Sequence, residues 1–149
     1  MDVNDAQSPR NAPSPCTCAM LRRTARRVTR IYDRALRPAG VRLTQYSVLA
    51  NINGTGGLSI SELAERLEME RTTLTRNLRP LVRAGWVIVA RGNDRRQRSV
   101  GLTQAGRQVY AAAYPLWQAA EQHLREALGH DAEALRGLLD ATLERTSVD

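Results

Sequence analysis

The sequence predicts a mainly α fold with a small β-wing, in which long N- and C-terminal helices flank a winged helix-turn-helix head. Three observations predict it. Apolar residues recur at helical spacing along most of the chain, a short capped helix is closely followed by a second helix over residues 59–84, and two β-prone runs enclose a turn segment at 92–97. We expect one domain over residues 16–149, with the head at 43–103, after a disordered arm at 1–15 that is polar and proline-rich.

The first expected helix covers residues 17–37 and ends before Pro38. Its apolar residues alternate four- and three-residue spacing, the pattern of a helix with one buried seam: Leu21, Ala25, Val28, Tyr32 and Ala35. Another face carries an arginine at every fourth position: Arg22, Arg26, Arg30 and Arg34. We interpret this stripe as a solvated face in preference to a DNA contact.

The second expected helix begins at Thr44, whose side chain can cap it, and runs to about Asn53. Its inward residues are Tyr46, Leu49 and Ile52. Glycines at 54, 56 and 57 then end the helix.

Ser59 and Glu62 have the spacing of a capping box, which places a third helix at about 61–67. A short link leads to a fourth helix at about 71–84, with Gly85 as its C-terminal stop. Its buried face is expected to be Leu74, Leu78, Leu81 and Val82. Pro80 removes a backbone donor in the third turn, so we expect a kink or loosening there that leaves the N-terminal half intact.

The residues of the fourth helix that lie outside this buried face form a basic and threonine-rich surface: Arg71, Thr72, Thr73, Thr75, Arg76 and Arg79. A helix fits the major groove, where arginine can bind guanine and threonine can contact thymine methyl groups or phosphates. The position after a short capped helix favours DNA reading over an ordinary basic surface.

The runs at 86–89 and 99–102 predict a hairpin, the wing, because the segment between them is rich in turn-forming residues. Beyond it, Thr103 can cap a long helix with a possible bend at Pro115, and Gly129 ends that helix. Asp131 can cap a last helix. The helices at 16–37 and 104–149 show no obvious core of their own, so we expect them to pack against a second copy of the chain as dimerisation helices.

The net charge of +7 and the use of arginine for all 22 basic residues favour a polyanionic partner. A GC-rich genome is an equally good explanation of the arginine bias.

These motifs resemble the MarR family of bacterial winged-helix regulators. Asp94-Arg95-Arg96 before an aliphatic strand, Leu102-Thr103-Gln104-Ala105-Gly106, and the helix start Thr72-Thr73-Leu74-Thr75-Arg76 carry the resemblance, which covers residues 18–146. It implies a homodimer on double-stranded DNA. It also implies that Arg96 enters the minor groove, that Asp94 holds it there, and that Arg95 and Arg98 contact phosphates.

Cys16 and Cys18 lie where the arm meets the first helix, and a cysteine near a helix N-terminus can react as a thiolate. Cys18 and Tyr32 are similar in position to residues of the family's organic-hydroperoxide repressors, although Arg22 replaces a second tyrosine of those proteins. Three readings stay open: incidental or structural cysteines, thiol oxidation, and capture of a soft metal ion with His123 or His130. Two sulfurs alone do not make a zinc site, so we expect no resident metal.

An aromatic effector is a further candidate, in a crevice formed by Tyr46, Tyr110, Tyr114 and Trp117, although core packing is the default for such residues.

The sequence therefore predicts a cytoplasmic, dimeric DNA-binding transcriptional regulator, most simply a repressor released by an effector or by cysteine modification. The alternative is a winged-helix module that binds protein or RNA without operator specificity. No catalytic constellation, phosphate loop or cofactor motif is present, and we expect no enzyme activity, no cofactor and no membrane span.

Overall fold

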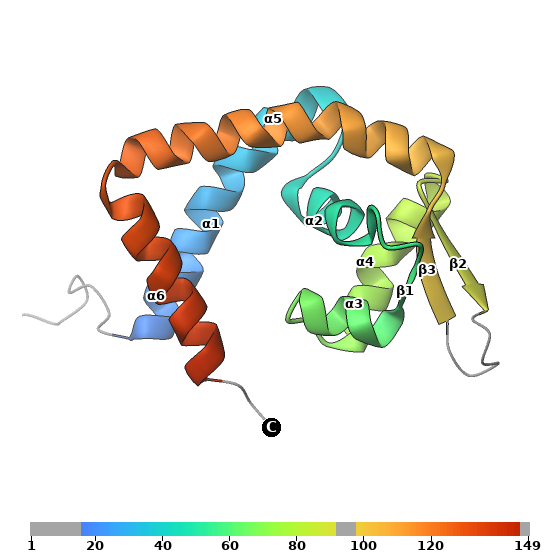
Figure 1. Cartoon of the computed structure of the whole chain (residues 1–149), viewed down its shortest axis with the longest axis horizontal. Helices are drawn as coiled ribbons and strands as arrows, with labels where there is room; N and C mark the ends of the chain where they lie inside the picture. Colours follow the sequence, from blue (N-terminus) through green and yellow to red (C-terminus); the bar gives the residue numbers. More distant parts are fainter. Residues whose placement is uncertain (1–15, 92–97, 147–149) are drawn as a thin grey trace, which may run out of the picture.

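A computed structural model of the chain describes residues 16–91 and 98–146, and the expected N-terminal arm lies outside them. The chain forms an arch (Figure 1), with a head on one side and a leg on the other, both held under one long helix. The head contains α2 (Leu43–Ile52), β1 (Leu58–Ser59), α3 (Ile60–Arg66), α4 (Arg71–Arg83), β2 (Val87–Arg91) and β3 (Arg98–Leu102). The leg contains α1 (Thr17–Leu36) and α6 (Asp131–Arg145), and α5 (Gln104–Leu128) spans both parts.

The helix α1 confirms the first expected helix and is followed by a short 3-10 turn, η1 (Arg37–Ala39), which contains Pro38. The second helix begins one residue earlier than expected. Its N-cap is Arg42, whereas Thr44 lies inside the helix and does not cap it. Two other oxygens accept its first amides: Gln45 Oε1 is 2.9 Å from Arg42 N, and Asp33 Oδ1 of α1 is 2.7 Å from Leu43 N.

The capping box of α3 is confirmed. Glu62 N lies 3.1 Å from Ser59 Oγ, and Ser59 N lies 2.8 Å from Glu62 Oε2. Because these bonds satisfy free amides at the helix start, a helix of only seven residues can begin at a defined position.

The helix α4 buries Leu74, Leu78 and Leu81 as expected. Val82 is 42% exposed, so its assignment to the core was wrong. At 100° per residue Val82 lies about 80° around the helix from Leu74, at the edge of the apolar stripe. The helix stays continuous through Pro80 to Arg83. Pro80 lacks the amide that would donate to the Arg76 carbonyl, and both residues lie on the exposed side of the helix.

Gly85 ends α4 as expected. Its φ of 73° is left-handed, and the amides of Gly85 and Trp86 donate to the carbonyls of Val82 and Leu81, each at 3.0 Å. This pattern is a Schellman motif, which reverses the chain into β2.

The expected hairpin is confirmed as β2 and β3, which pair antiparallel with Val89 opposite Val100. A third strand, β1, was not expected: Leu58 pairs with Val100 and Ser59 with Ser99, giving the strand order β1-β3-β2. Two residues carry no readable alternation, so the sequence offered no signal for this strand.

Thr103 caps α5 as expected, with Gly106 N 3.0 Å from its Oγ1. Gly129 ends α5, also as expected, with a φ of 58°. Asp131 is not the cap of α6. The N-cap is His130, whose backbone is already helical, because the turn starts at Gly129, whose carbonyl accepts from Ala132 N at 3.2 Å.

Two cores hold the arch together. The head core is built around Leu49, Leu63, Leu74, Leu81 and Val100, all fully buried. The second core joins α1 to α5 and α2. It contains Tyr32, Leu36, Val41, Tyr46, Ala113 and Ala120.

The expectation that the terminal helices lack a core of their own is therefore wrong for the upper half of α1 and for α5. It holds for α6, which buries no residue in this chain. Among the residues described, no helix is both long and apolar enough to span a bilayer.

Candidate nucleic-acid interface

The exposed face of α4 forms an open hollow of about 650 Å³. We call it the recognition hollow, and its lining residues are Arg71, Thr72, Thr75, Arg76 and Arg79. All five belong to the surface predicted from the sequence to read DNA. The sixth predicted residue, Thr73, is half-buried and does not line the hollow.

The chemistry of the recognition hollow is cationic with short polar side chains. The guanidiniums of Arg71, Arg76 and Arg79 are donors and have no ion-pair partner among the described residues. The hydroxyl of Thr75 already donates to the carbonyl of Arg71 at 2.8 Å, so toward a ligand it can act only as an acceptor. Such a surface can bind phosphates and the acceptor-rich edge of guanine.

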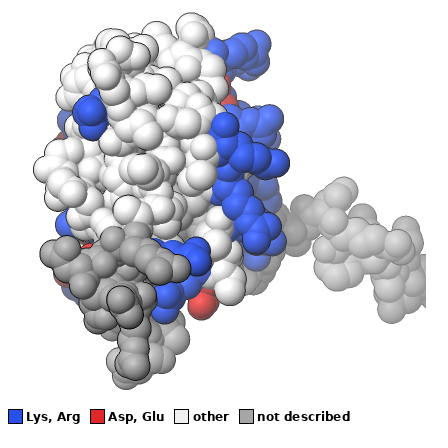
Figure 2. All heavy atoms as spheres, turned by 90° about the vertical axis from the view of Figure 1, so that its right-hand side faces the viewer, with Lys and Arg blue, Asp and Glu red and all other residues white. Residues whose placement is uncertain are grey.

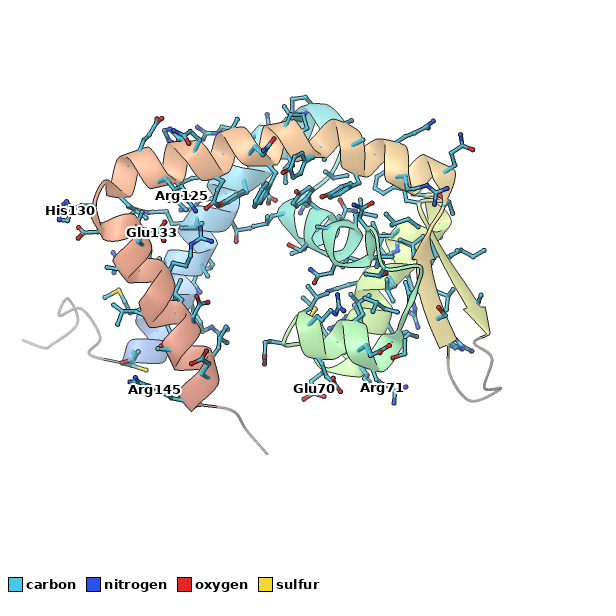
Figure 3. All side chains as sticks on the ribbon, in the orientation of Figure 1. Glu70, Arg71, Arg125, His130, Glu133 and Arg145 are labelled. Carbon is cyan, nitrogen blue, oxygen red and sulfur yellow. The ribbon has the colours of Figure 1, made fainter. Side chains whose placement is uncertain are left out.

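The electrostatics of this side of the head are dominated by arginine. No acidic residue occurs within α4. Figure 2 views the molecule from the wing side and shows the basic side chains gathered along one edge, with few acidic ones among them. Figure 3 shows Glu70 and Arg71 at the end of the head farthest from α5. The start of α4 is therefore open to a large partner.

The wing supplies one described residue of the predicted site. Arg98 is exposed at the first position of β3, where it pairs with Arg91 of β2. The other predicted wing residues, Asp94, Arg95 and Arg96, lie outside the described residues. The two strands nevertheless show that the wing root is anchored in the sheet that also covers the head core, through Val87 and Val100.

The predicted sensing residues are not brought together within one chain. Cys16 is the N-cap of α1 and Cys18 lies in its first turn, and both are exposed. Tyr32 is 14 residues beyond Cys18, about 21 Å along the helix. Its hydroxyl donates to Glu121 of α5.

Glu121 is a residue that the sequence reading missed, and it joins three helices. One carboxylate oxygen binds Tyr32, and the other lies 3.3 Å from Arg125 Nε and 2.7 Å from a terminal nitrogen of Arg136. Arg125 in turn pairs with Glu133 at 3.3 Å, and Figure 3 shows these two side chains facing each other. In the sequence, the only sign of this role is that Glu121 and Arg125 are four residues apart, the spacing of an ion pair on one helix.

This environment moves two pKa values in opposite directions. The hydrogen bond from Tyr32 is the main cause that lowers the pKa of the Glu121 carboxyl, with help from both arginines. Burial, followed by the bond to Glu121, raises the pKa of the Tyr32 hydroxyl well above its usual range. Both groups therefore keep their usual protonation states at neutral pH, and the bond between them is charge-assisted.

The structure can be compared with the soft-metal reading of the cysteines and histidines. Within residues 16–91 and 98–146, no three side chains of the metal-binding types gather into a possible site, and His123 and His130 are exposed.

The four aromatic residues of the proposed crevice pack on each other. Tyr46 stacks on Tyr110 and Trp117 at centroid distances of 5.8 and 5.7 Å, and Tyr114 stacks on Trp117 at 6.0 Å. Tyr46, Tyr110 and Trp117 belong to the second core, as expected for core packing, whereas Tyr114 is 40% exposed at its edge.

Comparison with known proteins connects these features to a family. Residues 39–97, which include the recognition hollow, match the profile of the MarR family. An HTH-type transcriptional regulator of Bacillus subtilis, YwoH, is 27% identical over 126 residues, which cover 84% of this chain and 92% of that protein.

Solved structures of transcriptional regulators have a similar fold. The M. tuberculosis transcriptional regulator MosR, crystallised with DNA, is 40% identical with a TM-score of 0.77, and the match covers 85% of this chain and 92% of MosR. A point mutant of E. coli MarR, crystallised with operator DNA, is 29% identical with a TM-score of 0.76, over 85% of this chain and 92% of that one.

Proposed function

This chain belongs to the MarR family of DNA-binding transcriptional regulators, and on that premise we propose that it is a homodimeric repressor of a pseudo-palindromic operator. In the proposal, α4 enters the major groove, the wing enters the minor groove, and an effector or a cysteine modification releases the DNA. Because the related proteins are transcriptional regulators, we propose no enzymatic role.

The observation that carries the proposal is the composition of the recognition hollow. Among the described residues, only arginine and threonine line it, and the leucines of α4 face the opposite way into the head core. In this arrangement the apolar face fixes the helix to the head while the basic face is left for a polyanion. Arg76 is the residue we assign to a guanine, and Arg71, Thr72, Thr73, Thr75 and Arg79 are assigned to flanking base or phosphate contacts.

Support for a dimer comes from unburied apolar side chains on the leg. On α6, Leu138 is 68% exposed and Leu143 is 57% exposed, and on α1 Met20 is 50% exposed. Leu21, Leu135 and Leu139 are exposed on the same two helices. A second copy of the chain can cover these residues. The two heads would then read half-sites about one helical turn, roughly 10 bp, apart.

For the wing we propose that Arg96 inserts into the minor groove, that Asp94 orients it, and that Arg95 and Arg98 bind phosphates. Arg98 is the one of these in the described part of the chain, and its exposure at the start of β3 is compatible with that role.

For release we propose modification of Cys16 or Cys18 as one route. Both are exposed at the start of α1, which is also part of the proposed dimer surface. Release of operator DNA by peroxide, arsenite or copper should then be weakened in Cys16→Ser or Cys18→Ser. Identical release in the wild type and both variants would leave a small-molecule effector as the better explanation.

The experiment that tests DNA reading is a salt titration of binding to a fragment of the protein's own promoter and to unrelated DNA of equal length. We expect Arg76→Ala to weaken promoter binding by about 1–3 kcal/mol and to reduce discrimination between the two DNAs. Arg96→Ala should lower affinity for both and reduce the salt slope by about one. Arg145→Ala, at the far end of α6, is the matched control and should behave like the wild type.

Equal affinity of the wild type for both DNAs at every salt concentration would overturn the repressor proposal and favour a winged-helix module for protein or RNA.

A further inference from the structure

A second basic hollow lies between the end of α1 and the start of α2, and it shares no residue with the recognition hollow. It has a volume of about 580 Å³. We call it the arginine hollow, and its lining residues are Arg30, Asp33, Arg34, Arg37, Gly40, Val41 and Arg42. The volume is in the range of sites for small ligands.

The charges of the arginine hollow do not balance. Among its described lining residues, four arginines contribute guanidiniums and only Asp33 contributes a carboxylate. In the described part of the chain none of these arginines has an ion-pair partner within 4 Å, whereas Arg125 and Arg136 of the leg are paired. Arg30 and Arg34 are also four residues apart on one helix, a spacing at which like charges repel. A bound anion would relieve this repulsion.

The one carboxylate already has a structural role. Asp33 Oδ1 accepts the amide of Leu43 at 2.7 Å and so holds the start of α2 against α1. It is therefore committed to the backbone rather than available as a counter-ion.

The walls of the hollow are fixed by the fold. Leu36 and Val41, on either side of the turn, are buried, at 0% and 3% exposure. Gly40 has a φ of 71° and donates its amide to the carbonyl of Arg37 at 3.0 Å, which closes the turn between the two walls. Because the backbone at Arg37 and Arg42 is held on both sides, little backbone ordering is left for a ligand to induce.

From these observations we propose that the arginine hollow binds a small ligand bearing two or more phosphate groups. A single carboxylate or phosphate can engage one or two guanidiniums, whereas a chain of phosphates can span arginines from α1, η1 and the start of α2. The η1 turn lies beside α5 at the top of the arch, and α4 begins at the opposite end of the head (Figures 1 and 3), so a straight duplex seated on the start of α4 is directed away from this hollow.

Isothermal titration of the full-length protein with inorganic triphosphate, at about 0.15 M salt to screen exposed charges, tests the proposal. We expect saturable binding of one triphosphate per chain, and an affinity at least about tenfold lower in the double variant Arg34→Gln/Arg37→Gln, which loses two charge-assisted contacts. Inorganic monophosphate at matched ionic strength should bind more weakly than triphosphate. The double variant should keep the thermal stability and the promoter affinity of the wild type, because both side chains are exposed and outside the recognition hollow.

The matched control is Arg76→Gln/Arg79→Gln, which removes the same charge from the recognition hollow. If this control loses triphosphate affinity as much as the double variant does, the anion binds the DNA-reading face and the proposal is wrong. It is also wrong if triphosphate does not bind the wild type, or if Arg34→Gln/Arg37→Gln changes the oligomeric state while triphosphate affinity stays the same. None of these results bears on promoter binding, which is measured separately.

Discussion

The contact between α5 and the root of the wing gives the sharpest prediction about this fold. Gly106 is buried in the first turn of α5, and a Cβ added to it would lie 2.0 Å from the carbonyl oxygen of Trp86 and 2.9 Å from the carbonyl carbon. A carbon and a carbonyl oxygen usually approach no closer than about 3.3 Å. Gly106→Ala therefore forces two backbones apart by about 1.3 Å.

The same displacement strains a set of hydrogen bonds at Thr103. Its amide donates to the Trp86 carbonyl at 3.1 Å, its hydroxyl donates to the Gly85 carbonyl at 2.6 Å, and its Oγ1 accepts from Gly106 N at 3.0 Å. Overpacking in a well-packed site costs about 1–3 kcal/mol, and each weakened hydrogen bond adds about 1 kcal/mol. We expect Gly106→Ala to lower the free energy of unfolding by about 3 kcal/mol and the Tm by about 6–12 °C.

Gly137→Ala is the matched control, since it makes the same chemical change in the middle of α6. A Cβ at Gly137 meets no atom within 4 Å. Removal of a glycine from a helix interior should raise the free energy of unfolding by about 0.5–1 kcal/mol. The two variants are compared by urea and thermal denaturation at one protein concentration, because dimerisation makes the Tm depend on concentration. A Gly106→Ala protein within about 0.5 kcal/mol of the wild type would refute the steric reasoning.

Three further substitutions test other parts of the structure. Ser59→Ala removes the α3 capping box and should lower the free energy of unfolding by about 1 kcal/mol in urea denaturation, with Ser61→Ala, inside the same helix, as a milder control. Tyr32→Phe removes the main cause of the lowered pKa of Glu121. A lowered carboxylate pKa contributes stability above the unfolded-state pKa that is lost as the pH falls, so Tyr32→Phe should destabilise more at pH 7 than at pH 3, and an equal loss at both would count against this coupling. Leu138→Glu should shift the protein toward monomer in sedimentation equilibrium, because burial of a leucine is worth about 1.5–3 kcal/mol per chain. The control Gln104→Glu, at the head end of α5, should leave the oligomeric state unchanged. A Leu138→Glu protein that stays dimeric would contradict the proposed interface.

The elements that the sequence predicted well have signals within a few residues. In each case the hydrogen-bond partner lies within a few residues. The side chains of Glu62 and Thr103 accept backbone amides at the starts of α3 and α5, and the amide of Gly85 donates to a carbonyl at the end of α4. The recognition hollow belongs to the same class, because its residues are the complement of one apolar stripe on one helix.

The features that the sequence did not predict depend on contacts between distant segments of the chain. Thr44 was a plausible cap, but Gln45 and Asp33, which is ten residues before Leu43, accept the first amides of α2 instead. The strand β1 is defined only by its pairing with β3. The role of Glu121 depends on a hydrogen bond from Tyr32, 89 residues away. Periodicity describes which face of an element is apolar and does not say which other element supplies a missing hydrogen-bond partner.

The helix α5 carries residues of both cores, since Val109 and Tyr110 pack against the head core and also against the second core. Over 25 residues it is about 37 Å long. A rod of that length acts as a lever: if it pivots by about 5° at the leg, its far end moves by about 3 Å, which is as long as a hydrogen bond itself. A change at the leg too small to disturb either core would thus be enough to move the α4 guanidiniums out of register with base edges.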